Sequence, residues 1–520
     1  MKRSLITAFI LMALALISLP LAAMRADSGK ERITITEECL AGDPAAAAGV
    51  TLQIASHWDK RLLWNTEYTI GGEKGAESKF TFSKKQASWG WTSDRGAGLY
   101  LRFSPANGWI STGSNTSYDS SSAEYYTALD GADTLFPDAV RAVAERTREG
   151  EKRTETVRIG DYYDCWPLGF TIEGSSVAYE GYYNEALDYL SDFFRIPTAD
   201  AQLQVTLEKN VTGDIISVKM RIISNDACTS IANLSAFGGE GIYYSYYLRR
   251  ESSREAADPG QNYGLFYFPY EQDEKSFLHI DLTQVRRLCD LPAGLLPIQM
   301  LLSEEGSLLY LLGKDGEDYR LLVYTLEGGA PVLAQQLWVY RNSSSSISAA
   351  GAASSGSAAA DAVSSNPALA GTQDASAPSP SFYRMSLEDG GILMTWSDGS
   401  FSFVTREDGQ HRWWCGGSFP ENSEQLYSQK LFPQENVCAF DGERLVLAAF
   451  DSLYSLNVLL TVCREGEQVY CGLYRHSGNE SAVFGGGMLL PIGQPDHTWF
   501  GRYSREAPLK LRIGGSPAGE

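Results

Sequence analysis

Pairs of an acidic residue and a glycine recur at short intervals through the second half of this 520-residue chain. The pairs are Glu305-Gly306, Asp315-Gly316, Glu327-Gly328, Asp389-Gly390, Asp398-Gly399, Asp408-Gly409, Asp441-Gly442 and Glu465-Gly466. Such pairs supply the positive φ that two-residue hairpin turns require, and short runs of strand-forming residues lie beside them. The segments 305–338, 389–415 and 441–474 are therefore predicted to be successive meanders of short strands.

The spacing of these three segments constrains the architecture further. Their starts lie 44 and 52 residues apart once the 40-residue tract 342–381 is set aside. This spacing resembles that of the four-stranded blades of a β-propeller. No recurrent Trp-Asp dipeptide or other named blade signature accompanies it, so the resemblance is to the architecture. It implies an all-β chain, a β-propeller of about seven four-stranded blades.

Strand-like runs outside the repeats extend this interpretation to the rest of the chain. They lie at 32–36, 50–55, 99–103, 241–248, 263–270, 277–282, 488–491, 497–503 and 509–513. A closed ring hides the edge strands that an open array would expose. We expect the 32–36 strand to close it by completing the blade that begins at 488–513.

Two segments in the first half predict short helices inserted between strands. The first, over 136–148, has Pro137 and Asp138 in its first turn, where proline is tolerated and an acid is favoured. The second covers 183–194. A separate α+β domain over 28–235, joined to a smaller propeller, is the alternative interpretation.

Composition indicates where the propeller is interrupted. Residues 342–381 carry only two charges, Asp361 and Asp374, no aromatic residue, and long Ser/Ala runs. Such a segment cannot bury a core. We expect 28–340 to form the first part of the propeller, 341–381 a disordered Ser/Ala-rich loop, 382–513 the remaining blades, and 514–520 a flexible tail.

The first 27 residues are expected to be a signal-anchor or a signal peptide. Two basic residues precede the uncharged run Leu5–Met24, which as a helix is just long enough to cross a bilayer core of about 30 Å. Signal cleavage favours small residues at −3 and −1, but the best site, after Ala23, has Leu21 at −3. We therefore predict an uncleaved single-pass anchor with an extracytoplasmic body. A cleaved, secreted protein is the alternative.

Eight cysteines are scattered along the chain without a C-x-x-C spacing, so neither a zinc site nor a redox pair is indicated. A chain with a large core needs no cystine framework, and a buried free cysteine packs as a small hydrophobe. We expect mostly free, buried thiols. Cys463 and Cys471 flank a turn at 464–467 that places Cys463 opposite a residue near 468, which argues against a bridge between them.

Charge and motifs exclude several classes of function. Asp and Glu number 64 against 43 Lys and Arg, a formal net charge of −21, so the chain lacks the basic field that nucleic acids require. Nucleotide loops and a G-x-S-x-G nucleophile elbow are absent, and the five histidines show no H-x-x-x-H spacing. No cofactor, metal site or catalytic residue is predicted.

Aromatic residues beside carboxylates concentrate between positions 161 and 247. Exposed rings next to acids suit sugars or peptides, because a flat apolar face stacks while the acid accepts hydrogen bonds. The predicted ligand-binding residues are Tyr162, Tyr163, Trp166, Tyr182 and Tyr183. Adjacent strand residues face opposite sides, so in Tyr243-Tyr244 and Tyr246-Tyr247 one ring of each pair should be core and the other exposed.

These patterns together favour a non-catalytic, membrane-anchored extracytoplasmic protein with a binding or sensory role. Its partner would be a peptide, a glycan or a membrane protein, in addition to the membrane itself. The alternative is a secreted or anchored polysaccharide hydrolase or lyase, because paired carboxylates can come from separate blades without a local motif.

Overall fold

The structure is a computed structural model, and it describes the elements of the chain together with parts of their connections. The described residues are 33–58, 62–82, 91–93, 98–103, 125–127, 137–166, 168–173, 186–198, 201–223, 228–250, 263–272, 278–326, 331–341, 382–388, 390–396, 399–418, 437–451, 455–479, 489–491, 502–504 and 509–514, with Met12–Leu14, Ile17, Ser18, Leu21 and Met24. The 342–381 tract, Tyr182 and Tyr183 lie outside them.

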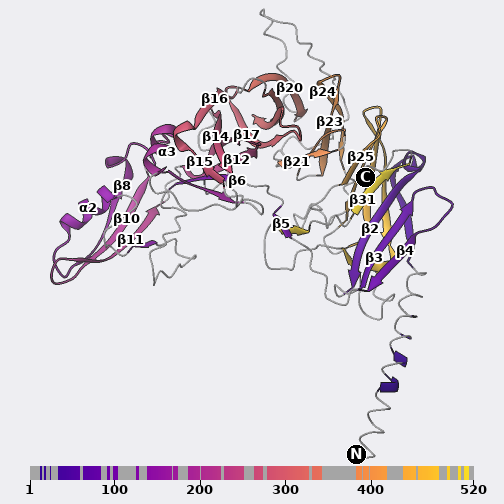
Figure 1. Ribbon diagram of the computed structural model, residues 1–520, viewed down its shortest axis with the longest axis horizontal. Coiled ribbons are helices and arrows are strands. Elements are labelled where there is room, and N and C mark those ends of the chain that lie inside the picture. Colours follow the sequence, from indigo (N-terminus) through magenta and orange to yellow (C-terminus); the bar gives the residue numbers. More distant parts are fainter. Residues whose placement is uncertain are drawn as a thin grey trace, which may run out of the picture. The chain divides into compact units, whose positions relative to one another are not determined.

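The chain forms two compact units. Unit 1 comprises Met1–Asp94 and Leu337–Glu520, and unit 2 comprises Arg95–Gln336. Both consist mostly of strands in antiparallel sheets, with few helices, which agrees with the predicted all-β class (Figure 1). That the sheets close into one ring of about seven blades stays a prediction.

Each predicted repeat forms four neighbouring strands of one antiparallel sheet in chain order, and the sheet of the third repeat has a fifth strand. The first sheet consists of β17 (Leu295–Leu302), β18 (Leu308–Asp315), β19 (Asp318–Thr325) and β20 (Val332–Tyr340). The second consists of β21 (Phe382–Glu388), β22 (Gly391–Trp396), β23 (Ser400–Glu407) and β24 (Gln410–Ser418). The third contains β25 (Val437–Phe440), β26 (Arg444–Phe450), β27 (Val458–Arg464) and β28 (Glu467–His476).

The turns between these strands adopt the predicted conformation. Asp408 and Gly409 have φ values of 50° and 79°, and Glu465 and Gly466 have values of 51° and 83°. Two successive residues at positive φ are the signature of the type I′ hairpin turn, whose twist matches that of the flanking strands. The second turn sets Cys463 opposite Gln468, so the predicted register of this hairpin is confirmed.

The two ends of the chain pair within unit 1. The first described strand, β1 (Ile35–Gly42), is followed by a 3₁₀ turn. A sheet follows, made of β2 (Val50–Trp58), β3 (Leu62–Thr69) and β4 (Glu77–Phe82). It is extended from the other end of the chain by β29 (Leu490–Pro491) and β31 (Leu509–Ile513), which both pair with β2. The first strand does not join this sheet, contrary to our expectation. Instead, β1 pairs antiparallel with β28 and covers an edge that would otherwise be exposed.

Buried tyrosines hold β1 in this position. The hydroxyls of Tyr470 and Tyr474 both donate to the Glu37 carboxylate, at 3.0 and 3.3 Å, and lie 3.0 Å from each other. Both tyrosine side chains are fully buried. Arg475 forms an exposed ion pair with Glu38, the neighbour of Glu37, at 2.7 Å.

Replacing Glu37 by Ala is expected to lower the free energy of unfolding by about 1–3 kcal/mol, because two buried hydroxyls lose a charged acceptor. Denaturant unfolding measures this loss. Glu38→Ala is the matched control on the same strand, and loss of its exposed ion pair should cost less than about 1 kcal/mol. Equal losses in the two variants would contradict this role of Glu37.

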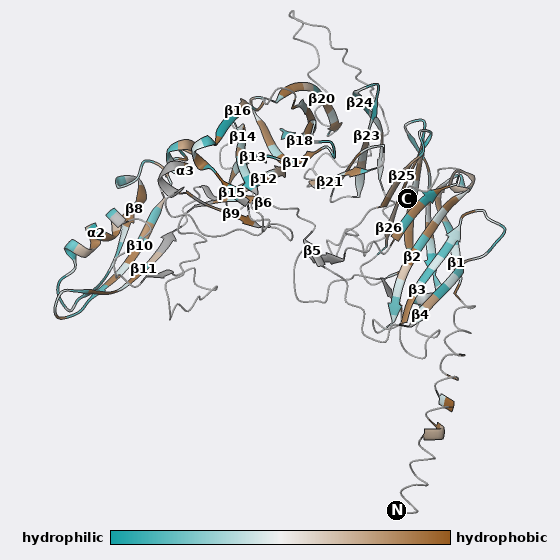
Figure 2. Cartoon of the chain, viewed as in Figure 1, coloured by the Kyte–Doolittle hydropathy of each residue, from teal (hydrophilic) through white to brown (hydrophobic). Residues whose placement is uncertain are grey.

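The sheets of unit 1 are stacked face to face. Strands β26 and β27 are buried on both faces, so their sheet has a neighbour on each side. Val446 lies in one core cluster with Leu52 of β2, whereas Leu447 lies in another with Phe403 of β23. Figure 2 shows hydrophobic residues along the strands of these sheets and hydrophilic residues at hairpin turns. Successive sheets packed through both faces are the arrangement found in propeller blades.

Unit 2 combines sheets with the two helices. Its further elements are β6 (Gly98–Phe103), β7 (Tyr125–Thr127), α2 (Pro137–Arg146), β8 (Lys152–Arg158), β9 (Leu168–Glu173), α3 (Ala186–Phe194), β10 (Gln202–Lys209), β11 (Ile215–Ile223), β12 (Cys228–Phe237), β13 (Gly241–Arg250), β14 (Gly264–Gln272), β15 (Leu278–Ile280) and β16 (Arg286–Asp290). Two short strands not yet named, β5 (Trp91–Ser93) and β30 (Arg502–Ser504), belong to unit 1 and pair with each other. Both helices lie within the ranges predicted for them.

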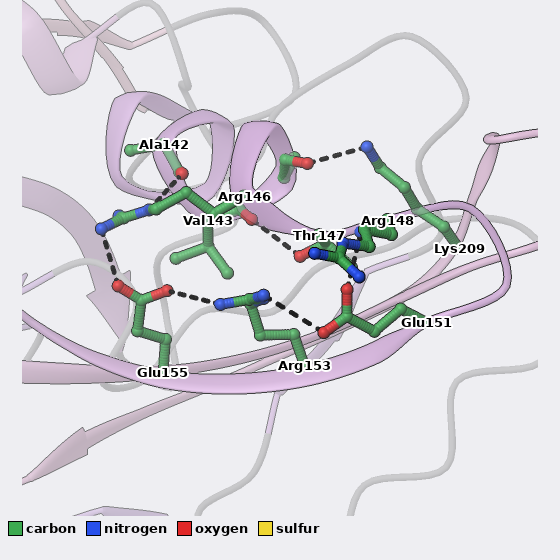
Figure 3. Close-up of polar contacts among 10 residues, drawn as sticks. Ala142, Val143, Arg146, Thr147, Arg148, Glu151, Arg153, Glu155 and Lys209 are labelled. Carbon is green, nitrogen blue, oxygen red and sulfur yellow. Dashed lines mark hydrogen bonds and ion pairs between the residues drawn. The ribbon is translucent and has the colours of Figure 1, made fainter.

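Helix α2 is fixed at its C-terminal end, where the last carbonyls of a helix lack intrahelical partners. Side chains bond to two of them, because Thr147 Oγ1 donates to Val143 at 2.7 Å and Lys209 Nζ to Ala144 at 2.7 Å (Figure 3). A third donor, Arg146 Nε, bonds to the carbonyl of Ala142, one position before them, at 2.8 Å. Two of the three donors are cationic, which suits the negative end of the helix dipole.

A ladder of alternating charges continues from this helix end along β8. Arg146 pairs with Glu155 at 2.7 Å, and Arg153 pairs with Glu155 at 4.0 Å and with Glu151 at 3.2 Å (Figure 3). The backbone amide of Arg148 donates to Glu151 at 2.8 Å and lowers the pKa of that carboxyl. Because each charge in the ladder faces an opposite charge, we assign it the structural role of joining α2 to the sheet.

None of the helices among the described residues is long and apolar enough to cross a membrane. Most of the Leu5–Met24 run lies outside the described residues, so the anchor stays a prediction. The described members of that run are helical.

Candidate ligand-binding surface

The predicted aromatic site begins at a short segment between β8 and β9. Trp166 is only 3% exposed and lies in the main core cluster of unit 2, and its backbone N–H donates to Ile196 at 2.8 Å. Its ring therefore packs the core and has no face free for a ligand, contrary to our expectation. The physical reason is that this segment pairs with the residues that follow α3, through Trp166 with Ile196 and Cys165 with Pro197, which brings the large apolar ring into the core.

The two tyrosines of this segment are half-buried against the same core. The Tyr163 hydroxyl accepts a hydrogen bond from the Asp138 backbone N–H at 2.9 Å and so serves the first turn of α2. Burial raises the pKa of Tyr163. Tyr162 has no such contact to a helix end among the interactions described, and its part in ligand binding stays a prediction.

The tyrosine pairs of β13 follow the predicted alternation. Tyr244 and Tyr246 are buried in the core that contains α3, with Phe194 edge-on to both rings at 6.2 and 5.5 Å. Tyr243 and Tyr247 point to the other face of the sheet, where they are only half-buried. Of each pair one ring is thus core, and the other reaches the boundary between core and solvent.

Three neighbouring strands align a row of aromatic and cationic side chains on that second face. Tyr243 of β13 pairs with Tyr267 of β14, and Tyr267 pairs in turn with Arg286 of β16. The two tyrosine rings lie 5.2 Å apart between centroids, tilted by 57°. The Arg286 guanidinium carbon lies 5.2 Å from the centre of the Tyr267 ring, within cation–π range. Arg286 itself is exposed.

An acidic residue stands at one end of this row. Glu240 lies in the exposed turn before β13, and its backbone carbonyl accepts a hydrogen bond from the Tyr270 N–H at 3.1 Å. Burial, followed by the neighbouring Tyr243 and then the Glu240 charge, raises the pKa of Tyr267, and Arg286 partly opposes that shift. Burial likewise raises the pKa of Tyr243. Both phenols are therefore neutral hydrogen-bond donors at physiological pH.

The row depends on a glycine at the start of β13. A Cβ atom at Gly241 would lie 2.3 Å from the Tyr267 ring, well inside contact distance. Any side chain at this position would push the ring out of the row.

Sequence reasoning missed Tyr267, Arg286 and Glu240, although the strand prediction at 263–270 included Tyr267. Cross-strand neighbours depend on register, which the local pattern of these strands does not reveal.

The described residues offer little for acid–base or metal chemistry. A general-acid carboxyl needs a raised pKa, whereas each described carboxyl with a resolved shift, among them Asp214 and Asp281, has a lowered one, chiefly through side-chain hydrogen bonds at those two. No group of three or more metal-ligating side chains with suitable geometry occurs within the described part of the chain. The row of Tyr243, Tyr267 and Arg286 can stack, donate hydrogen bonds and attract an acidic or hydroxyl group.

Comparisons with known proteins provide no family for this chain. No protein-family model matches the sequence, and no curated protein matches it significantly. Among solved structures it is similar to a protein provisionally named 6-phosphogluconolactonase from Bacteroides fragilis, with a TM-score of 0.29 and 7% identity over 81% of this chain and 93% of that one. A protein of the same provisional name from Bacteroides uniformis aligns with a TM-score of 0.28 and 9% identity, over 82% and 99% of the two chains. A β-propeller domain from Myceliophteria thermophila aligns with a TM-score of 0.22 and 8% identity, over 52% of this chain and 82% of that one. At these scores the likeness establishes neither a common fold nor a common function.

Proposed function

We propose that this protein is a non-catalytic extracytoplasmic binding protein that captures glycans through Tyr243, Tyr267 and Arg286. The observation that carries this proposal is the cross-strand row itself, in which two rings and a guanidinium lie within about one sugar's length of one another. Tyrosine faces stack on the C–H faces of sugar rings, while the guanidinium and the phenols hydrogen-bond to hydroxyl or carboxylate oxygens.

The proposed scaffold is a β-propeller of about seven blades. It is supported by the four-stranded repeats of β17–β28 and by the stacking of successive sheets through both faces within unit 1. A propeller presents its loops and strand ends as a broad rigid surface on which a binding site needs no catalytic group. The proposed location rests on the apolar run at Leu5–Met24, which would hold the body at the outer face of a membrane.

A glycan fits the row better than a peptide does. An extended peptide would need either an unpaired strand edge or a deep apolar pocket for an anchoring side chain. Here the rings belong to strands whose ladder partners are in place on both sides of β14. The row instead offers a half-exposed face of two tilted rings, bordered by one cation and one anion.

An array of neutral and uronic-acid-containing oligosaccharides, probed with the purified protein, tests this proposal. Tyr267→Leu removes the central ring and should weaken capture at least tenfold, since a central aromatic contact typically contributes more than about 1–2 kcal/mol. Arg286→Met should have its largest effect on acidic sugars. Arg141→Met, an exposed position on α2 paired only with Asp138 among the described contacts, is the matched control and should bind as the wild type does.

The outcomes separate the competing functions. The proposal is supported if the wild type and Arg141→Met capture an oligosaccharide and Tyr267→Leu does not. The melting temperature of Tyr267→Leu must then equal that of the wild type, so that the loss is one of binding and not of folding. Capture that Tyr267→Leu retains in full would overturn this surface. Shortened products released from a bound polysaccharide would instead establish the hydrolase or lyase alternative.

A further inference from the structure

Two cysteines from neighbouring sheets of unit 1 meet in the core between them. Cys415 lies in β24 and Cys463 in β27, and each is 0% exposed. Both belong to one hydrophobic cluster that also contains Phe403 and Leu447. Both thiols are free in this structure. They are 48 positions apart in the sequence, so their meeting is a tertiary contact.

A side-chain clamp beside the cysteines links β24, which carries Cys415, to β28, the strand paired with the one that carries Cys463. The Gln468 amide accepts a hydrogen bond from the Ser418 N–H at 3.0 Å, and donates one to the Ser418 carbonyl at 3.0 Å. Ser418 ends the strand that carries Cys415, and Gln468 is the ladder partner of Cys463. The clamp therefore holds β24 against β28 near the thiols, and β28 is hydrogen-bonded to β27.

The other thiols nearby have different contacts. Cys463 lies close enough to the Cys415 thiol to contribute, after burial, to raising the pKa of that thiol. Cys471 is instead held by Thr461 at 2.9 Å and by the Gln468 amide at 3.4 Å. Cys438 is half-buried beside them. Cys415 and Cys463 are thus two fully buried thiols of one cluster that lie beside each other.

We propose that Cys415 and Cys463 form a disulfide bond that joins the β21–β24 sheet to the β25–β28 sheet. Bond formation needs an oxidant, which we assign to the disulfide class: a dithiol–disulfide oxidoreductase in an extracytoplasmic compartment, or oxidised glutathione in vitro. One thiolate attacks the oxidant and forms a mixed disulfide, and the second displaces the oxidant's remaining sulfur. Two thiol protons and two electrons leave the cysteines, and the oxidant becomes two thiols.

Burial sets when this bond can form. It raises the pKa of the Cys415 thiol, and a buried thiol exchanges slowly because the attacking species is the exposed thiolate. The bond is therefore made while the chain folds, before the sheets close over both sulfurs. The proposed extracytoplasmic location matters here only because it would supply the oxidant. Oxidative refolding in vitro supplies the oxidant directly, so it tests whether the bond forms without testing where the protein resides.

The test refolds the full chain from denaturant in a mixture of reduced and oxidised glutathione, blocks free thiols with iodoacetamide and maps the peptides without reduction. The expected product links the peptides of Cys415 and Cys463. Reduced, already folded protein treated with the same mixture should stay unlinked at these positions. Peptides in which both cysteines are alkylated after refolding, or a link from Cys415 to Cys438, would overturn the proposal.

A thermal measurement reports the effect of the bond independently. Dithiothreitol should lower the melting temperature of the oxidised wild type by about 5–10 °C, because the cross-link restricts the unfolded chain. The variant C415A/C463A should melt at one temperature with or without dithiothreitol, whereas Cys289→Ala in unit 2 should behave as the wild type does. A wild type insensitive to dithiothreitol would also contradict the bond.

Discussion

Replacing Trp166 by Ala should lower the free energy of unfolding by about 3–5 kcal/mol, the usual cost of truncating a fully packed aromatic ring. The ring is 3% exposed and lies in the core cluster that α2, α3 and their sheet share. The measurement is denaturant unfolding followed by circular dichroism. Tyr162→Ala, four positions away and only half-buried, should cost clearly less. A loss below about 1 kcal/mol for Trp166→Ala would return this ring to the list of exposed contact residues.

A second large effect should appear on acidification, through the buried histidine of β28. His476 is 2% exposed, and burial lowers its pKa to about 4. The Gly478 N–H donates to its Nδ1 at 3.0 Å, so the proton resides on Nε2, which faces the Thr66 hydroxyl at 3.2 Å. Thr66 in turn contacts the Ser78 hydroxyl at 2.8 Å.

The sign of this effect follows from proton uptake. Between pH 6.5 and about 4 the unfolded chain binds a proton at this histidine that the folded chain does not, so stability present above pH 6.5 is lost as the pH falls. A shift of this size corresponds to about 3 kcal/mol. Burial, followed by the Arg406 charge, lowers the pKa of His411 to about 4 as well, which adds a loss of similar size over the same range.

Unfolding free energies measured from pH 7 to pH 4 test this prediction. His476→Gln should flatten the slope only in part, since His411 and the carboxyls with a lowered pKa keep their contributions, although the variant will be less stable at pH 7. His279→Gln is the control, because that side chain is exposed, and its slope should equal that of the wild type. A wild-type slope unchanged in His476→Gln would contradict the burial of an uncharged imidazole.

Local features of the fold were predictable from the sequence. Each acidic residue–glycine pair specifies a turn from its own φ preference, so the strands on both sides and the Cys463–Gln468 register could be derived within a few residues. Helix α2 followed from Pro137 and Asp138 in its first turn, and α3 also lies within the range predicted for it. The pairing of β1 with β28 joins residues 428 to 441 positions apart, and no local preference distinguishes that edge from the one expected.

The candidate site was less predictable for two physical reasons. A tyrosine-rich segment looks the same in sequence whether its rings are core or surface, and Trp166 shows how a ring beside acids can be core. The row itself combines Tyr243, Tyr267 and Arg286 from three strands, so it exists only once two strand registers are set. Because adjacent residues of a strand face opposite sides of a sheet, the sequence did indicate that one ring of the Tyr243-Tyr244 pair would point away from the core.

The most direct test of the glycan-binding surface is a crystal structure of the protein with the oligosaccharide that the array binds best. We predict a sugar ring stacked on Tyr267 at about 4 Å, the usual distance of apolar contact, with Arg286 hydrogen-bonded to one of its oxygens. An oligosaccharide bound elsewhere, with Tyr243, Tyr267 and Arg286 free of it, would contradict the account.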